Sequence, residues 1–64
     1  MLTEYLKPAT SLLYGTDLEL VAAKNAVEAG AQGAAERLTA AKEAYEVSCR
    51  QYTDACVRFI AENP

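Results

Sequence analysis

The side chains in this sequence best suited to chemistry are two cysteines, Cys49 and Cys56, which stand seven residues apart. On a helix this spacing puts both thiols on one side, about 10 Å from each other. An intrachain disulfide needs α-carbons within about 7 Å, so the two cannot pair within one chain. No histidine is present to deprotonate a nucleophilic thiol, and a zinc site needs two more ligands. We expect both cysteines to be small buried apolar residues, with an intersubunit disulfide or redox switch as the alternative.

The other polar residues form no catalytic or ligand-binding set. The segment Gly30-Ala31-Gln32-Gly33 lacks the preceding strand and the following Lys-Ser/Thr of a phosphate-binding loop. Glu43 and Glu46 are three residues apart on the polar side of a predicted helix, where a solvated face is the simplest interpretation. The sequence therefore predicts a protein that is not an enzyme and that carries no cofactor and no metal.

Length and charge narrow the functional class further. A chain of 64 residues forms one small domain at most, here 1–64, and buries only about 60% of its unfolded surface. Its hydrophobic fraction is 52%, but much of that is alanine, so we expect part of the core to lie between subunits of a homodimer. A net charge of −3 argues against nucleic-acid binding. No targeting segment or membrane span is predicted, and the expected location is the cytoplasm.

Two rows of residues with heptad spacing run along the C-terminal half. One row is large and the next, three residues further on, is small, a pattern that lets a second helix approach closely. We call these residues the seam, which consists of Ala34, Leu38, Ala41, Tyr45, Ser48, Tyr52, Ala55 and Phe59. The seam is the predicted protein interface, and its two tyrosines are candidates either for core packing or for binding hot spots.

A second apolar strip lies near the C-terminus. Thr53, Val57 and Ile60 fall away from the seam, and a helix that is apolar on two sides is usually sandwiched between neighbours. Val57 and Ile60 are therefore added to the predicted interface. They would contact either another part of the same assembly or a different protein.

Local signals divide the chain into helices. Pro8 can open a short helix over 8–14 that Gly15 ends. Thr16-Asp17-Leu18-Glu19 has the form of a capping box and predicts a helix over 17–29. Gly30 and Gly33 indicate a turn over 30–33, followed by a long helix over 34–62 with alternating charges on its polar side. One continuous helix over 17–62 is the alternative, because heptad spacing persists through the glycines.

The predicted fold is all-α, with a short N-terminal helix and a helical hairpin that dimerises into a helical bundle. The leading functional hypothesis is a small acidic protein-interaction module that binds and inhibits or regulates a larger protein. The alternative is a self-assembling structural or chaperone-like subunit. A redox element that uses Cys49 or Cys56 is a weaker third hypothesis.

Overall fold

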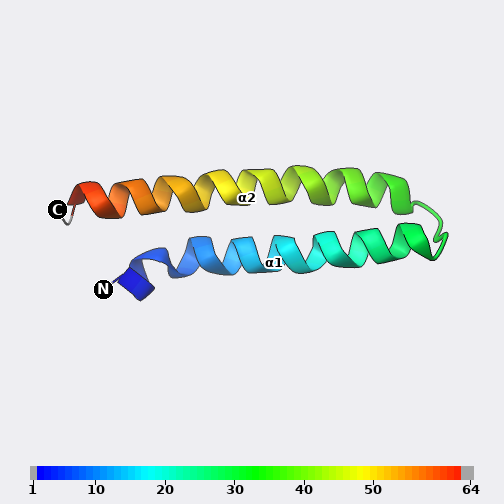
Figure 1. Cartoon of the computed structure of the whole chain (residues 1–64), viewed down its shortest axis with the longest axis horizontal. Helices are drawn as coiled ribbons and strands as arrows, with labels where there is room; N and C mark the ends of the chain where they lie inside the picture. Colours follow the sequence, from blue (N-terminus) through cyan, green and yellow to red (C-terminus); the bar gives the residue numbers. More distant parts are fainter. Residues whose placement is uncertain (1, 63–64) are drawn as a thin grey trace.

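Two long helices lie side by side and antiparallel in the computed structural model, which describes the backbone of residues 2–62 and the side chains of residues 6–62. Helix α1 runs over Leu2–Glu28 and helix α2 over Ala34–Glu62 (Figure 1). The described residues contain no strand. The predicted all-α hairpin with a long C-terminal helix is therefore confirmed, whereas its dimerisation stays a prediction.

The turn between the helices depends on two glycines with left-handed backbone. Gly30 has φ of 73° and Gly33 has φ of 75°, a region in which a Cβ clashes with the backbone. The N–H of Gly30 donates to the carbonyl of Val27, and the N–H of Ala31 donates to that of Ala26, each at 3.0 Å. These two bonds form a Schellman motif, which ends α1 and turns the chain back. The alternative of one continuous helix is wrong.

The predicted break between helices 8–14 and 17–29 is wrong, because α1 continues through Gly15. A glycine inside a helix costs only about 1 kcal/mol relative to alanine, and packing against α2 outweighs that cost. Thr16 caps nothing: its hydroxyl lies 3.0 Å from the carbonyl oxygens of Leu12 and Leu13 and 2.7 Å from Ser48 Oγ. A threonine and a glutamate three residues apart thus lie in the middle of a helix.

Pro8 also lies inside α1. A proline lacks the N–H that would bond to the preceding turn, and its ring presses on that turn, so it bends a helix. Figure 1 shows the first turn, in dark blue, set at an angle to the rest of α1. The helix therefore tolerates Pro8 close to its start, where few backbone hydrogen bonds are lost.

Small and large residues alternate in layers along the contact between the helices. The Thr16–Ser48 contact fixes the antiparallel register, so that one heptad back on α1 matches one heptad forward on α2. Ala9 is level with Ala55 and Ala23 with Ala41. In the intervening layers Leu6, Leu13, Leu20 and Val27 of α1 are level with Phe59, Tyr52, Tyr45 and Leu38 of α2.

The small layers bring the two helices close together. Ala23 and Ser48 are fully buried and Ala41 is 3% exposed, whereas the large seam residues Tyr45 and Tyr52 are only half-buried. Close approach along the small layers forces large side chains to spread towards the sides of the hairpin. The core is therefore narrow, and its large residues stay partly open to solvent.

A pair of hydroxyls joins the helices at the centre of one small layer. Thr16 Oγ1 and Ser48 Oγ are 2.7 Å apart, and Ser48 Oγ is also 2.7 Å from the carbonyl oxygen of Tyr45. Each hydroxyl has one proton, so one proton serves the interhelical bond and the other a backbone carbonyl. Both hydroxyls are satisfied whichever of the two donates to the other.

A bidentate ion pair joins the helices nearer the turn. Arg37 Nε donates to Glu19 Oε2 at 2.7 Å and Arg37 Nη2 to Oε1 at 2.9 Å. This hydrogen bonding lowers the pKa of the Glu19 carboxyl and raises that of the Arg37 guanidinium. Both side chains are about half exposed, so the pair orients the helices more than it stabilises them.

Acidification should weaken the hairpin through Glu19. Because its pKa is lowered in the folded state, its contribution is present above the unfolded-state pKa and is lost as pH falls through the folded-state pKa. We expect the free energy of unfolding, measured by urea denaturation at a series of acidic pH values, to fall less steeply in Glu19→Gln. Glu43→Gln, which removes an exposed carboxylate elsewhere, is the control. Identical pH profiles for Glu19→Gln and the parent would contradict the role of this pair.

The hairpin is elongated, with extents of 49 × 16 × 12 Å. Its radius of gyration is 14.8 Å, compared with about 11 Å expected for a compact domain of this length. Two helices in a single layer cannot enclose a core on all sides. Both broad sides of the hairpin are therefore open.

Candidate protein-interaction face

The predicted seam lies against the chain's own α1. Ala41 and Ser48 are buried and Leu38, Tyr45, Tyr52, Ala55 and Phe59 are half-buried, and all of them belong to the layers that face α1. The helix that covers the seam is thus supplied by the same chain. Contact between the seam and a second protein stays a prediction.

Val57 and Ile60 lie exposed on the surface of α2. They are 60% and 67% exposed, so the second apolar strip is open, as an interaction surface requires. A matching strip on α1, which the sequence did not lead us to expect, is formed by Tyr14, Leu18 and Val21, whose exposed fractions are 51–66%. Their spacing of four and three residues is the signal that could have identified it, but this spacing alone does not say which face of a helix is covered.

One broad side of the hairpin gathers the aromatic and sulfur-containing side chains. Three hollows along this side are lined by residues of both helices or of α2 alone, with volumes of about 350, 310 and 260 Å³. We call this side the aromatic face, which is formed by Leu6, Leu13, Tyr14, Tyr45, Cys49, Tyr52, Cys56, Phe59 and Ile60. It includes every aromatic side chain that the structure describes.

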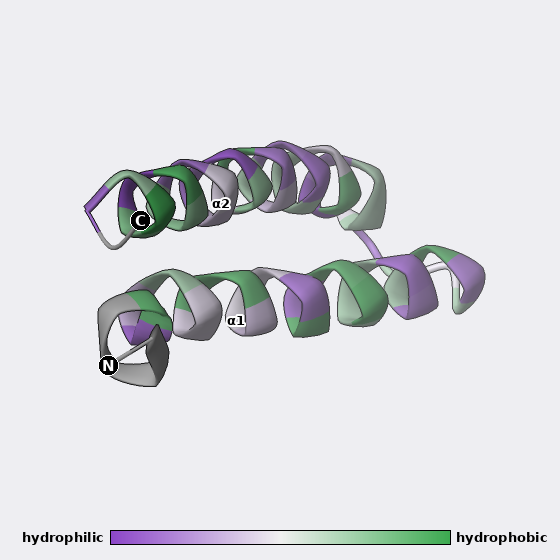
Figure 2. Ribbon diagram, turned by 60° about the vertical axis from the view of Figure 1, so that its left-hand side comes forward, coloured by the Kyte–Doolittle hydropathy of each residue, from purple (hydrophilic) through white to green (hydrophobic). Residues whose placement is uncertain are grey.

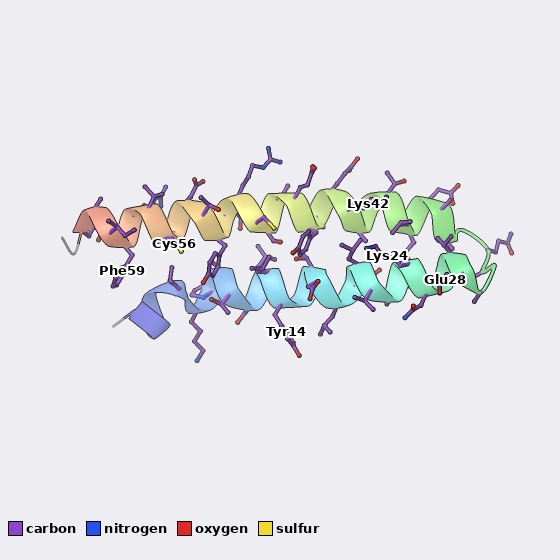
Figure 3. The ribbon with its side chains drawn as sticks, in the orientation of Figure 1. Tyr14, Lys24, Glu28, Lys42, Cys56 and Phe59 are labelled. Atoms are coloured by element: carbon purple, nitrogen blue, oxygen red, sulfur yellow. The ribbon has the colours of Figure 1, made fainter. Side chains whose placement is uncertain are left out.

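The apolar character of this face is strongest at the open end of the hairpin, away from the turn. The hollow between Leu6, Tyr52 and Phe59 has almost wholly apolar walls. Figure 3 shows Phe59 reaching from α2 towards the N-terminal end of α1, and Tyr14 projecting away from α2. Figure 2 shows that hydrophilic residues occupy much of the outer side of α2, whereas hydrophobic residues are spread around α1.

Both cysteines are half-buried free thiols on the aromatic face. Hydrogen bonding to the Cys49 side chain raises the pKa of the Tyr45 phenol, and the nearby charge of Asp17 acts in the same direction. Cys49 and Cys56 contribute small apolar volume between the rings of Tyr45, Tyr52 and Phe59.

The opposite broad side differs in chemistry. Its hollow, at about 480 Å³, is larger than the three on the aromatic face, but polar groups of Gln51, Asp54 and Arg58 line it beside Pro8 and Leu12. This mixture suits hydration better than burial against a protein. Among the residues that the structure describes, no group of three potential metal ligands comes together, and no helix is long and apolar enough to cross a lipid bilayer.

The chain matches no protein-family model, no curated protein and no solved structure. What it does must therefore be inferred from its own surface.

Proposed function

We propose that this protein is a non-enzymatic interaction module that binds a larger protein through the aromatic face and regulates it by covering the bound surface. The observation that carries the proposal is the aromatic face itself. Tyr14, Tyr45, Tyr52 and Phe59 lie on one open side of the hairpin, and aromatic residues dominate the energetics of protein interfaces.

The shape of the face favours a helix as the element that is bound. Three hollows lie on this face, one at the open end of the hairpin and two near its middle, and an amphipathic helix can bind such a surface through apolar residues one turn apart. The open end of the hairpin, with Leu6, Cys56 and Ile60, would hold the most apolar part of that helix.

A matched pair of variants tests the proposal. Cys49→Glu places a charge on the aromatic face, whereas Val47→Glu makes a similar change two residues away on the outer side of α2, where Val47 is exposed. We expect tagged wild type and Val47→Glu to capture one stoichiometric protein from a lysate of the native cell under reducing conditions. Cys49→Glu should capture at least tenfold less, since a buried unpaired charge costs several kcal/mol.

Two results would contradict the proposal. Equal capture by Cys49→Glu and Val47→Glu would remove the aromatic face as the binding site. Recovery of nothing except untagged copies of the chain would favour the second candidate, a self-assembling structural or chaperone-like subunit. The observation that supports this second candidate is the narrow core, whose large residues are left half-buried in the single hairpin.

A further inference from the structure

We propose that, in the absence of another partner, the aromatic face is covered by a second copy of this chain turned end for end, giving an antiparallel four-helix bundle. The inference rests on the proposed function, because it uses the same face as the binding surface. It adds the occupant of that face, the register of the two copies and a consequence for regulation.

The exposed area of the hairpin matches what a dimer would bury. A folded protein of this mass typically exposes about 4000 Å², whereas the hairpin exposes 4808 Å². The difference, about 800 Å², is close to the area that one partner contributes to a standard protein–protein interface. A second copy on one broad side would bring the exposure of each chain to that of an ordinary folded protein.

The residues of α2 on this face are complementary in shape to the same residues of a second copy. Tyr45, Cys49, Tyr52 and Cys56 alternate between large and small at spacings of four and three residues, the spacing of a coiled-coil seam. In an antiparallel pair related by a two-fold axis between positions 50 and 51, Tyr45 meets the partner's Cys56 and Cys49 meets the partner's Tyr52. Each ring then fills the space beside a thiol, and the same contact is made twice, as two-fold symmetry requires.

The same two-fold axis determines which residues of α1 meet in the dimer. Because Thr16 contacts Ser48, a position two residues back on α1 is level with one two residues forward on α2, so Tyr14 lies level with Arg50. The two copies of Tyr14 therefore meet close to the axis. The burial of this side chain, which is 66% exposed in one hairpin, would remove from water the most exposed aromatic ring among the described side chains.

Electrostatic repulsion favours the end-for-end dimer over the alternative dimer, in which the same faces meet but the two-fold axis runs parallel to the helices. Lys24 and Lys42 lie level with each other between the aromatic face and the turn, as Figure 3 shows. An axis parallel to the helices would bring the four lysines of the two copies together, and their repulsion would oppose assembly. The end-for-end arrangement puts the two lysine pairs at opposite ends, roughly 30 Å apart at 1.5 Å per residue.

A consequence for regulation follows from the shared face. A second copy and a larger protein cannot occupy the aromatic face at once, so the dimer is a resting form that partner binding separates. Disulfide formation is not needed for this exchange, because each thiol lies beside a ring and not beside the other thiol.

Sedimentation equilibrium of the reduced protein over a range of micromolar concentrations tests the dimer. We expect wild type and Val47→Glu to sediment as dimers and Cys49→Glu as a monomer, with circular dichroism showing that all three remain helical. A wild-type monomer at every concentration would overturn the inference, as would equal dimerisation of Cys49→Glu and Val47→Glu.

Cross-linking tests the register. Tyr45→Cys combined with Cys49→Ser leaves thiols at positions 45 and 56, which are about 16 Å apart along one helix and cannot pair within a chain. Diamide, which accepts two electrons and two protons for each disulfide formed, should link this variant into a covalent dimer. The control also carries Cys56→Ser, so its only thiol is at position 45, about 16 Å from its counterpart in the proposed dimer, and it should not be linked. Equal cross-linking of both variants, or none in a helical dimer, would overturn the register.

The two proposals fail differently. A monomer that captures another protein through the aromatic face overturns the dimer and leaves the proposed function in place. A dimer that captures no other protein overturns the larger-partner proposal and leaves the second copy as the natural occupant.

Discussion

Replacement of Ala41 by leucine should remove much of the stability of the hairpin. Ala41 is 3% exposed and lies level with Ala23, in a layer where the two helices are in close approach. Three added carbon atoms have no space there without pushing the helices apart. Overpacking of this kind costs about 1–3 kcal/mol, while a chain of this size rarely has more than about 3–5 kcal/mol in total.

The neighbouring residue provides the control. Ala40 is exposed on the same helix, and Ala40→Leu makes the same change in volume and helix propensity without touching α1. We expect Ala41→Leu to lower the free energy of unfolding by about 2–3 kcal/mol and Ala40→Leu to change it by less than about 0.5 kcal/mol. Urea denaturation followed by circular dichroism, at one fixed protein concentration, measures both. Similar losses in the two variants would mean that the small layers do not set the distance between the helices.

Glycine-to-alanine substitution should have opposite effects at Gly30 and Gly15. A Cβ added at either position would meet no packed neighbour within 4 Å, so packing plays no part and backbone conformation decides. Gly30 is left-handed, where a Cβ costs about 1–2 kcal/mol. Gly15 is helical, where alanine is favoured over glycine by roughly 0.5–1 kcal/mol.

Thermal and urea denaturation of the two variants distinguish these effects. We expect Gly30→Ala to be destabilised and Gly15→Ala to be stabilised relative to wild type. Gly30→Asn should fall between wild type and Gly30→Ala, because asparagine enters the left-handed region more readily than alanine. A loss of stability in Gly15→Ala would indicate that α1 is interrupted at that position.

The sequence was sufficient to predict α2 and the turn. The alternation of large and small residues from Ala34 to Phe59 has one period and no interruption, and Gly30 and Gly33 supply the left-handed backbone that a reversal needs. Both signals are local, so they can be interpreted without knowing what lies opposite. The solvent-facing charges of α2 are equally visible in its spacing.

The continuity of α1 could not be predicted in the same way. Gly15 and the sequence from Thr16 to Glu19 have the form of a helix end followed by a helix start, and local propensity alone favours a break there. What overrides it is nonlocal: the Thr16 hydroxyl bonds to Ser48, and Glu19 pairs with Arg37. The two residues that resemble a cap therefore both contact α2.

The candidate site was only partly predictable for a related reason. The spacing of Tyr45, Tyr52 and Phe59 identifies one side of α2, but the sequence does not say how much of it α1 covers. The structure shows that the helices approach closely at the layers of small residues, and this close approach explains why the large side chains remain half-buried. The contribution of α1, above all Tyr14, emerged from the hollow that Leu13 and Tyr14 line together with Tyr45 in the folded chain.

The turn links the two helices covalently at one end of the hairpin only. Residues paired near Gly30 and Gly33 are close together along the chain, whereas Leu6 and Phe59 meet only after the rest of the chain has folded between them. The loop that each layer closes becomes longer with distance from the turn. The layers farthest from the turn therefore lose the most chain entropy when they form, and they are the least protected against local opening. We therefore expect opening to start at the end that carries the most apolar part of the aromatic face, which is also the end where the proposed partner would make its most apolar contacts.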